Sequence, residues 1–329
     1  MTEKNLLTAV RDALHDEMAH DERIVLLGED VGARGGVFRL SQGWLEEFGP
    51  ERVIDTPLAE SGLVGVAIGM ALHGLLPVAE IQFADFIHPA FDQIVSEAAR
   101  MRYRSNGDFG CPLVIRAPCG GGVHGALYHS QSIEATYAHV PGLKVVMPAT
   151  PADAAGLLRS AIRDPDPVLF LEHKKAYRAV TGEVPDTFAT TPIGVADVKR
   201  RGDDLTVVTY GYELHRCLDA AVRLGQDQGA SIELVDVRTL APLDVDTILA
   251  SARRTGKVMV VSEDNRSYGA GAELASTIAE EAFFDLDAPV LRIGSPDVPA
   301  MPFAAPLEHA FLEPTPDHLY RAMRDLIAS

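Results

Sequence analysis

The sequence predicts an α/β protein of two domains, and three observations support this fold class. The chain has 329 residues, of which 47% are hydrophobic and 23% charged, which is ordinary globular composition for more than one domain. Short β-branched runs alternate with segments of helical periodicity along the chain, as α/β folds require. This alternation lapses over Val180–Asp204, a stretch with Gly, Pro, Thr and mixed charges.

The first half begins with an amphipathic helix over 5–20, because Leu6, Val10, Leu14 and Met18 recur at helical spacing. Helix 151–163 should start at Thr150 as the N-cap, with Pro151 at the first position and Asp153 as a capping-box partner. Strands are predicted over 23–28, 75–83, 112–116, 144–147 and 168–171, and a further helix over 89–103.

The second half predicts a smaller α/β unit with a mostly parallel sheet. Its strands are expected over 205–210, 232–237, 258–262 and 290–293, and its helices at 211–225, 245–254, 273–284 and the C-terminus. We therefore predict a first domain over 1–185, a linker over 186–203 and a second domain over 204–329.

Charge and apolar runs exclude several classes of partner. The net charge of −18 argues against nucleic acid and against an anionic membrane surface. The longest apolar run, Leu63–Leu72, is half of the about twenty residues that a membrane span needs. The N-terminus lacks the apolar core of a signal peptide, and the three cysteines form no CxxC pair. We expect a bacterial cytoplasmic location or, as an alternative, a mitochondrial matrix.

The segment DTPLAESG at 55–62 leads into a helix whose glycines Gly62, Gly65 and Gly69 share one face. This spacing predicts that the helix approaches another backbone closely. Glu60 lies in the first turn, where a carboxylate also complements the helix dipole without any further role. The segment alone favours that structural role.

Two further segments carry polar side chains at expected strand ends. Ile81–Phe86 follows a strand at the edge where α/β sheets bind ligands, although its phenylalanines are also suited to a core. The loop Cys119–Gln131 is glycine-rich and holds His124 and His129, but it lacks the Lys-Ser/Thr of a P-loop. Its histidines suit acid–base chemistry, and a loop histidine is equally compatible with simple exposure.

In order, these segments resemble the β subunit of the thiamine-diphosphate-dependent decarboxylating component of 2-oxo acid dehydrogenase complexes. The resemblance covers essentially the whole chain. The matching segments are LLGEDVG (26–32), DTPLAESG (55–62), AEIQFADF (79–86), FDQIVSEAARMRYRS (91–105), GALYHSQSIEA (125–135), PGLKVV (141–146), DAAGLLRSAIRDPDPVLFLE (153–172), VDVRTLAPLD (235–244) and GAGAE (269–273). The resemblance implies a transketolase-like pyrimidine-binding domain followed by a smaller transketolase-type C-terminal domain.

The same resemblance implies thiamine diphosphate as cofactor and an α subunit as partner. In that family the α subunit carries the Gly-Asp-Gly…Asn motif that holds Mg²⁺ and diphosphate, and no such motif is present here. The resemblance further implies an α2β2 heterotetramer, a 2-oxo acid substrate and a lipoylated dihydrolipoyl acyltransferase core that receives the acyl group.

Site residues follow by matching positions. Glu60 matches the glutamate that hydrogen-bonds a ring nitrogen of the cofactor's aminopyrimidine, and His129 matches a histidine that exchanges a proton during acyl transfer to lipoyl sulfur. Phe86 matches the aromatic residue that packs on the aminopyrimidine. The other cofactor-lining positions are Glu29, Leu58, Ala59 and Gln82. The substrate-side positions are Phe83, Ala84, Asp85, Phe86 and His129.

FADF and GALYHSQS resemble branched-chain (2-oxoisovalerate) enzymes more than those acting on pyruvate or acetoin, which stay as alternatives. His88 stands where branched-chain relatives usually have Phe, and this leaves the substrate side open. A self-sufficient transketolase-type enzyme would need a diphosphate motif in this chain. A non-catalytic subunit would have lost Glu60 or His129, and both are present.

The family often holds potassium at a helix end, formed by carbonyl and carboxylate oxygens. A capped helix end without an ion fits the same residues equally well, and Asp166 replaces the more usual Asn. The matching positions are Leu113, Ala161, Ile162, Asp164 and Asp166.

Overall fold

The computed structural model describes residues 1–311 and 314–329. The chain divides into two compact units, one formed by residues 1–119 and 136–193 and the other by residues 120–135 and 194–329. The domain boundaries predicted from the sequence place loop 120–135 in the first domain, whereas its contacts group it with the second unit. Among the described residues, no helix has the length and apolar character needed to cross a bilayer.

The first unit is built on a parallel sheet in the order β6–β7–β5–β4–β2–β3. Its buried strands are β2 (Ile24–Gly28), β3 (Val53–Asp55), β4 (Leu76–Glu80), β5 (Val114–Cys119), β6 (Lys144–Val146) and β7 (Val168–His173). Burial of both sheet faces explains why these strands are apolar runs rather than alternating patterns. The α/β reading of this half of the sequence is confirmed.

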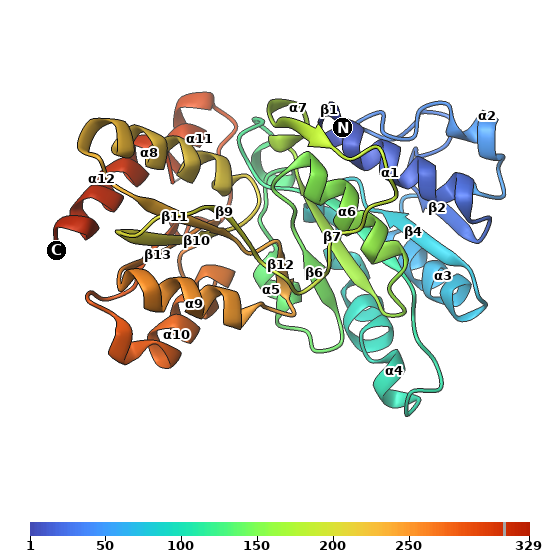
Figure 1. Ribbon diagram of the computed structural model, residues 1–329. Coiled ribbons are helices and arrows are strands. Elements are labelled where there is room, and N and C mark those ends of the chain that lie inside the picture. The colour runs from blue at the N-terminus through green and yellow to red at the C-terminus, as the bar shows by residue number, and fades with distance from the viewer. Residues whose placement is uncertain (312–313) are drawn as a thin grey trace. The chain divides into compact units, whose positions relative to one another are not determined.

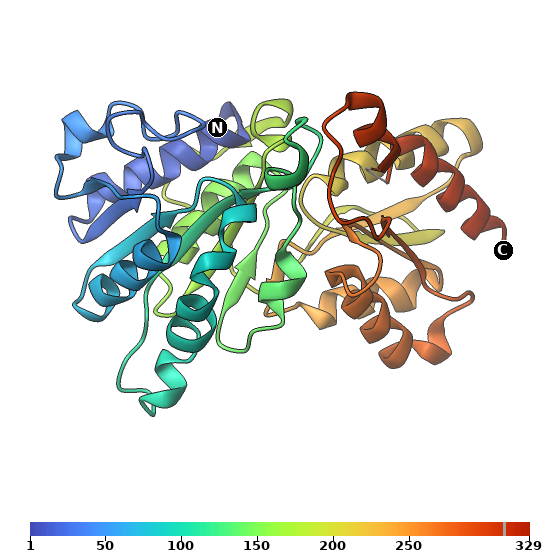
Figure 2. The same ribbon diagram turned by 180° about the vertical axis from the view of Figure 1, so that it is seen from behind.

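Helices cover both faces of this sheet. α1 (Leu6–His20) and α6 (Pro151–Ile162) lie side by side over one face, and α3 (Glu60–Leu72) lies over the other (Figures 1 and 2). Thr150 caps α6 as predicted, since its hydroxyl accepts a bond from the Asp153 amide at 3.2 Å and donates to the Asp153 carboxylate at 2.7 Å. Shorter helical segments are α2 (Trp44–Phe48), α4 (Met101–Arg104), α5 (Glu134–Ala138), α7 (Ala176–Ala179), η1 (Ala84–Phe86) and η2 (His88–Ala90).

The predicted regular helix over 89–103 is interrupted. After η2 the chain forms a π-helical turn, η3 (Gln93–Ala98), in which the Ala99 amide donates to the Ile94 carbonyl, before α4 begins. Gly142 packs against this turn: a Cβ there would lie 2.0 Å from the Ala99 carbonyl oxygen. Apolar periodicity could not reveal the π-helical turn, because it does not distinguish π from α turns. It also says nothing about which residue packs against the turn.

Two strands lie where the sequence predicts an irregular connection. β8 (Thr181–Val184) pairs antiparallel with β1 (Thr2–Asn5) in the first unit, and β9 (Asp197–Arg200) is an antiparallel edge strand in the second. Both are four residues long and partly polar. Short edge strands with exposed faces lack the apolar pattern that identifies buried ones, so the sequence did not indicate them.

The second unit has a sheet in the order β14–β13–β10–β11–β9, parallel except for β9, as predicted. α8 (Glu213–Gln228) and α12 (Pro316–Ala328) pack together on one face, and α9 (Val245–Thr255) and α10 (Ala270–Glu281) lie on the other (Figure 1). Its remaining elements are β10 (Leu205–Thr209), β11 (Ile232–Asp236), β12 (Thr239–Ala241), β13 (Val258–Asn265), β14 (Leu291–Ser295), η4 (Ala126–Tyr128), η5 (Phe283–Asp285) and α11 (Ala305–Phe311).

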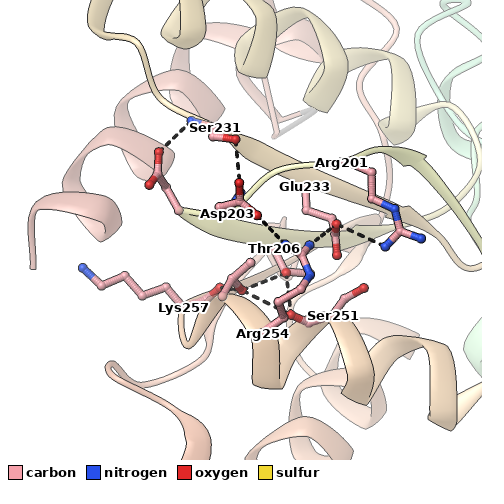
Figure 3. Close-up of polar contacts among 10 residues, drawn as sticks. Arg201, Asp203, Thr206, Ser231, Glu233, Ser251, Arg254 and Lys257 are labelled. Carbon is pink, nitrogen blue, oxygen red and sulfur yellow. Dashed lines mark hydrogen bonds and ion pairs between the residues drawn. The ribbon is translucent and has the colours of Figure 1, made fainter.

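A cluster of charged side chains lies at the amino ends of β10 and β11 in this sheet and consists of Arg201, Asp203, Glu233 and Arg254. Figure 3 shows Arg254 of α9 between Asp203 and Glu233 of β11. The Glu233 side chain is fully buried, and Arg201 approaches the same carboxylate at 3.7 Å. A buried carboxylate needs such cationic partners. The cluster ties α9 to the sheet.

Candidate active site

Three neighbouring parallel strands of the first unit end at one edge of the sheet. β2 lies between β3 and β4. The chain leaves β2 into Glu29, β3 into Thr56 and β4 into Ile81. The carboxyl edge of a parallel sheet is where α/β proteins bind ligands. The residues matched to cofactor positions therefore gather at this edge.

Asp55 holds the loop that carries Glu29. Its carboxylate accepts bonds from the backbone amides of Gly32, at 2.6 Å, and Ala33, at 3.2 Å. A Cβ at Gly32 would lie 2.8 Å from the Asp55 carboxylate, so this approach requires glycine. The sequence did not single out Asp55 as a site residue, although Asp55 and its partner Gly32 both lie within segments that carry the family resemblance.

The carboxylates of Glu29 and Glu60 lie near enough at this edge for the charge of Glu60 to raise the pKa of Glu29. Glu60 is the first residue of α3 and only 8% exposed. Burial raises the pKa of Glu29, and the negative charges of Glu60 and then Asp30 raise it further. Among the described residues, the buried atoms Glu29 Oε1 and Thr56 Oγ1 have no hydrogen-bond partner. The edge therefore offers buried acceptors to a ligand that carries N–H donors.

Gln82 joins this group from the end of β4. Its Nε2 lies 3.4 Å from the Glu29 carbonyl oxygen and 3.4 Å from Asp30 Oδ2. Phe83 and Phe86 follow, with ring centroids 5.9 Å apart in an edge-to-face arrangement. Ala84 and Asp85 are buried in η1 between them.

Leu58 and Ala59 precede α3 and are both exposed. Leu58 is 80% exposed, so its side chain is accessible to a ligand. Taken with the contacts of Glu29 and Gln82, the structure places four of these side chains at one sheet edge: Glu29, Thr56, Glu60 and Gln82.

His129 belongs to the other unit, in the loop that follows β5. It ends η4 and is partly exposed, and its amide donates to the Ala126 carbonyl at 3.4 Å. Four loop residues, Gly120, Gly122, His124 and Ala126, have φ between 56° and 80°. The loop is thus strained at two non-glycine positions, a feature that gathers at functional sites.

The sequence missed a buried ionic network on the strands next to the edge. Arg116 of β5 donates to Glu80 of β4 at 2.7 Å and to Glu172 of β7 at 2.7 and 2.9 Å. Tyr177 donates to Glu172 at 2.8 Å. Burial raises the pKa of Glu80 even though Arg116 lowers it. Charged residues within otherwise apolar strands were the available signal.

The residues matched to a potassium site all lie in the first unit. Asp164 accepts a bond from Lys144 Nζ at 2.5 Å, and Asp166 accepts one from Arg102 Nε at 2.6 Å. The Leu113 carbonyl accepts from Val168, and the Ala161 carbonyl from Asp164. These groups do not fit a bound cation well, because both carboxylates are already neutralised. The potassium site stays a prediction.

Two family models match the chain in succession. The transketolase pyrimidine-binding domain matches residues 3–180, and the transketolase C-terminal domain matches residues 194–319. A solved structure described as "Split gene transketolase, inactive beta4 tetramer" superposes with a TM-score of 0.77 at 25% identity, over 98% of each chain. The predicted transketolase-like fold class is confirmed by these matches.

Several relatives are similar over nearly their whole length. 2-Oxoisovalerate dehydrogenase subunit beta of Bacillus subtilis (strain 168) is 56% identical over 326 residues, which are 99% of each chain. The 3-methyl-2-oxobutanoate dehydrogenase subunit beta of Mycobacterium tuberculosis (strain ATCC 25618 / H37Rv) is 49% identical, covering 95% of this chain and 89% of the relative. The pyruvate dehydrogenase E1 component subunit beta of B. subtilis is also 49% identical, covering 92% and 93%.

These relatives confirm the resemblance seen in the sequence. Full-length similarity at 56% identity and two family models in the expected order point to the same group. The chain belongs to the family of 2-oxo acid dehydrogenase β subunits, which are built from transketolase-type pyrimidine-binding and C-terminal domains.

Proposed function

We propose that the chain is the β subunit of a branched-chain 2-oxo acid dehydrogenase. The enzyme would decarboxylate 2-oxoisovalerate-type acids oxidatively and pass the acyl group to a lipoyl group. The observation that carries the proposal is the buried Glu60 at the start of α3, beside Glu29, at the carboxyl edge of the sheet. Relatives named for 2-oxoisovalerate and 3-methyl-2-oxobutanoate support the substrate class.

Thiamine diphosphate is the cofactor of this proposal, and when bound it supplies the electron sink for decarboxylation. The described residues fit its aminopyrimidine end, because acceptors on Glu29, Glu60 and Thr56 are buried at one edge with no other partner for Glu29 Oε1 or Thr56 Oγ1. Glu60 would hold a proton between its carboxyl oxygen and a ring nitrogen of the aminopyrimidine. Phe86 would pack against the ring, and Leu58, Ala59 and Gln82 would line it.

His129 has a separate role in the proposal. It would exchange a proton with the reacting group during acyl transfer to lipoyl sulfur, because an imidazole can both donate and accept a proton. Phe83, Ala84 and Asp85 would shape the substrate side together with Phe86 and His129.

The proposed enzyme needs an α subunit. That partner would hold Mg²⁺ and the diphosphate, because this sequence lacks the diphosphate motif. An α2β2 heterotetramer that docks on a lipoylated dihydrolipoyl acyltransferase core completes the assembly. Since the relatives compared here are bacterial, a bacterial cytoplasmic location is part of the proposal. Potassium is left out of it, because Lys144 and Arg102 already neutralise the two carboxylates.

Pyruvate is the second candidate substrate. The specific observation in its favour is the 49% identity to a pyruvate dehydrogenase subunit, only moderately below the 56% for the 2-oxoisovalerate relative. His88, at the start of η2 and exposed, replaces the Phe of branched-chain relatives close to Phe86. A bulky polar group on the substrate side would alter the preferred chain length.

The test is reconstitution of this chain with a candidate α subunit from the same organism. Decarboxylation of pyruvate is compared with that of the three branched-chain 2-oxo acids, with thiamine diphosphate and Mg²⁺ present. A preference for the branched acids supports the proposal, and a preference for pyruvate replaces its substrate class.

A further inference from the structure

The loop that carries His129 has little regular structure of its own. Between Gly120 and Gln131 the chain forms one short 3₁₀ turn, and the Gly120 amide donates to the Gln131 carbonyl at 2.9 Å. Backbone amides in such a loop need acceptors from elsewhere if they are withdrawn from water. The identity of those acceptors shows what holds the loop in shape.

Two carboxylates of the same unit receive these amides. Glu263 of β13 accepts from the Gly121 amide at 2.7 Å. Glu308 of α11 accepts at Oε1 from the amides of Gly122, at 3.0 Å, and His124, at 3.2 Å. Its Oε2 lies 2.6 Å from His124 Nδ1. The Glu308 side chain is fully buried and that of Glu263 nearly so. Bonds from amides to a buried carboxylate are among the stronger hydrogen bonds in proteins.

The C-terminal end of the loop is bonded to the same carboxylate, that of Glu263. Ser132 Oγ donates to Glu263 Oε1 at 3.3 Å, so one carboxylate oxygen joins both stems. Two residues on, Glu134 accepts from Tyr210 at 3.0 Å. The acidic surroundings are costly: burial, followed by the negative charges of Asp264 and Glu263, raises the pKa of Glu134 to about 8. Burying a carboxylate is unfavourable unless its oxygens accept hydrogen bonds, and those of Glu263 and Glu308 accept them from the loop.

The backbone next to His124 packs directly against His129, so restraining His124 also restrains His129. A Cβ at Gly125 would lie 2.4 Å from the His129 carbonyl oxygen and 2.8 Å from its Cβ. The turn is therefore closed tightly between positions 125 and 129. A shift of the His124 backbone would move His129 with it.

We infer that Glu263 and Glu308 are positioning residues, which fix loop 120–131 and thereby aim His129 for acyl transfer. This inference rests on the proposed function, because it takes the role of His129 from it. Neither glutamate belongs to the residues matched to cofactor or substrate.

The test uses the full chain assembled with its α subunit. Glu308→Ala removes both acceptor oxygens, whereas Glu308→Gln keeps one acceptor and the side-chain volume. Glu280→Ala, at an exposed position on α10, is the matched control. His129→Ala is included as a separate arm. The measurements are amide hydrogen exchange over residues 120–131, acyl transfer to lipoamide, decarboxylation with an artificial oxidant, and Tm.

We expect Glu308→Ala to speed exchange of the loop amides at least about tenfold, since each lost charge-assisted bond is worth about that factor or more. Acyl transfer should fall about as much, and decarboxylation with the artificial oxidant should fall less. Glu308→Gln should stay within about threefold of the wild type, and Glu280→Ala should match it.

Unchanged exchange in the loop of Glu308→Ala would overturn the inference. So would faster exchange throughout the unit with a collapsed Tm, since the glutamate would then serve stability alone. If Glu308→Ala does not assemble, Glu263→Ala, which removes the acceptor of the Gly121 amide, is measured by the same criteria. If His129→Ala leaves acyl transfer intact, the role of His129 in the proposed function fails instead. Loop exchange in Glu308→Ala still reports whether the carboxylate holds the loop, so the two failures are distinguishable.

Discussion

Arg116 and Glu172 form a two-pronged ion pair inside the first unit, with the guanidinium Nε and Nη2 donating to the two carboxylate oxygens at 2.7 and 2.9 Å. Both side chains are almost completely buried, and Glu80 shares the same arginine. Because one cation serves two carboxylates, its removal leaves uncompensated charge in the core.

Arg116→Met should therefore lower the free energy of unfolding by about 3–5 kcal/mol. Arg104→Met is the matched control, because Arg104 forms an exposed pair with Glu97 and should cost at most about 1 kcal/mol. Urea unfolding of the two variants measures the difference. Equal stabilities would show that the buried network is not the support that its geometry indicates.

Glu60→Ala should abolish turnover and leave assembly with the α subunit intact. The reason is that the proposed hydrogen bond to the aminopyrimidine has no substitute at the start of α3. Initial rates and size-exclusion chromatography are the measurements, with the exposed Glu22→Ala as control. Survival of more than about a tenth of the activity, a loss of under roughly 1.4 kcal/mol of transition-state stabilisation, would remove this role from Glu60.

His129→Ala should impair acyl transfer to lipoamide more than decarboxylation with an artificial oxidant. Loss of one proton-exchanging group typically costs about 10²–10⁴-fold in the step it serves. The two assays are run on the same preparation. An equal loss in both would place the histidine in an earlier step or in loop folding.

Glu134 makes the stability of the second unit depend on pH. Its pKa is raised from 4.5 to about 8, first by burial and then by Asp264 and Glu263. The folded chain thus keeps a proton that the unfolded chain releases above pH 4.5. Stability contributed by this group is complete below pH 4.5 and is lost as pH rises toward about 8.

Glu134→Gln should flatten this dependence, because an amide keeps an acceptor for Tyr210 and carries no charge. Relative to wild type, its Tm should rise by roughly 2–5 °C more at pH 8.5 than at pH 5. Acids away from this cluster, such as Glu213, contribute in both proteins, so the difference reports Glu134 together with its interaction with Asp264 and Glu263. A constant difference in Tm across this range would contradict the account.

Buried strands and amphipathic helices were predictable from the sequence because each leaves a periodic apolar pattern. α1 begins within one residue of its predicted start, and β2 ends at the predicted Gly28. The capped start of α6 followed from Thr150 and Pro151 alone. Site residues Glu29, Glu60 and Gln82 came from strand ends and matched segments, and the structure brings them together.

Other features depend on partners far apart in the sequence and leave no local pattern. β1 and β8 are polar four-residue strands that pair across the length of the first unit's chain. Glu308 holds the Gly122 amide from 186 residues away. The glycine face of α3 has no close backbone neighbour among the described residues of this chain, so the close approach predicted from its spacing stays a prediction: the nearest atom to a Cβ at Gly65 is Gln93 Cγ at 3.9 Å. Helical spacing shows which residues share a face, but not what packs on it.

The most direct test of the central claim is the rate of 2-oxo acid decarboxylation by this chain alone and by this chain mixed with its α subunit. Thiamine diphosphate and Mg²⁺ are added to both, over pyruvate and the three branched-chain acids. We predict activity only in the mixture, and the highest rate with the branched acids. Activity of this chain alone would contradict the account, because it would show a complete cofactor site in a sequence that lacks the diphosphate motif.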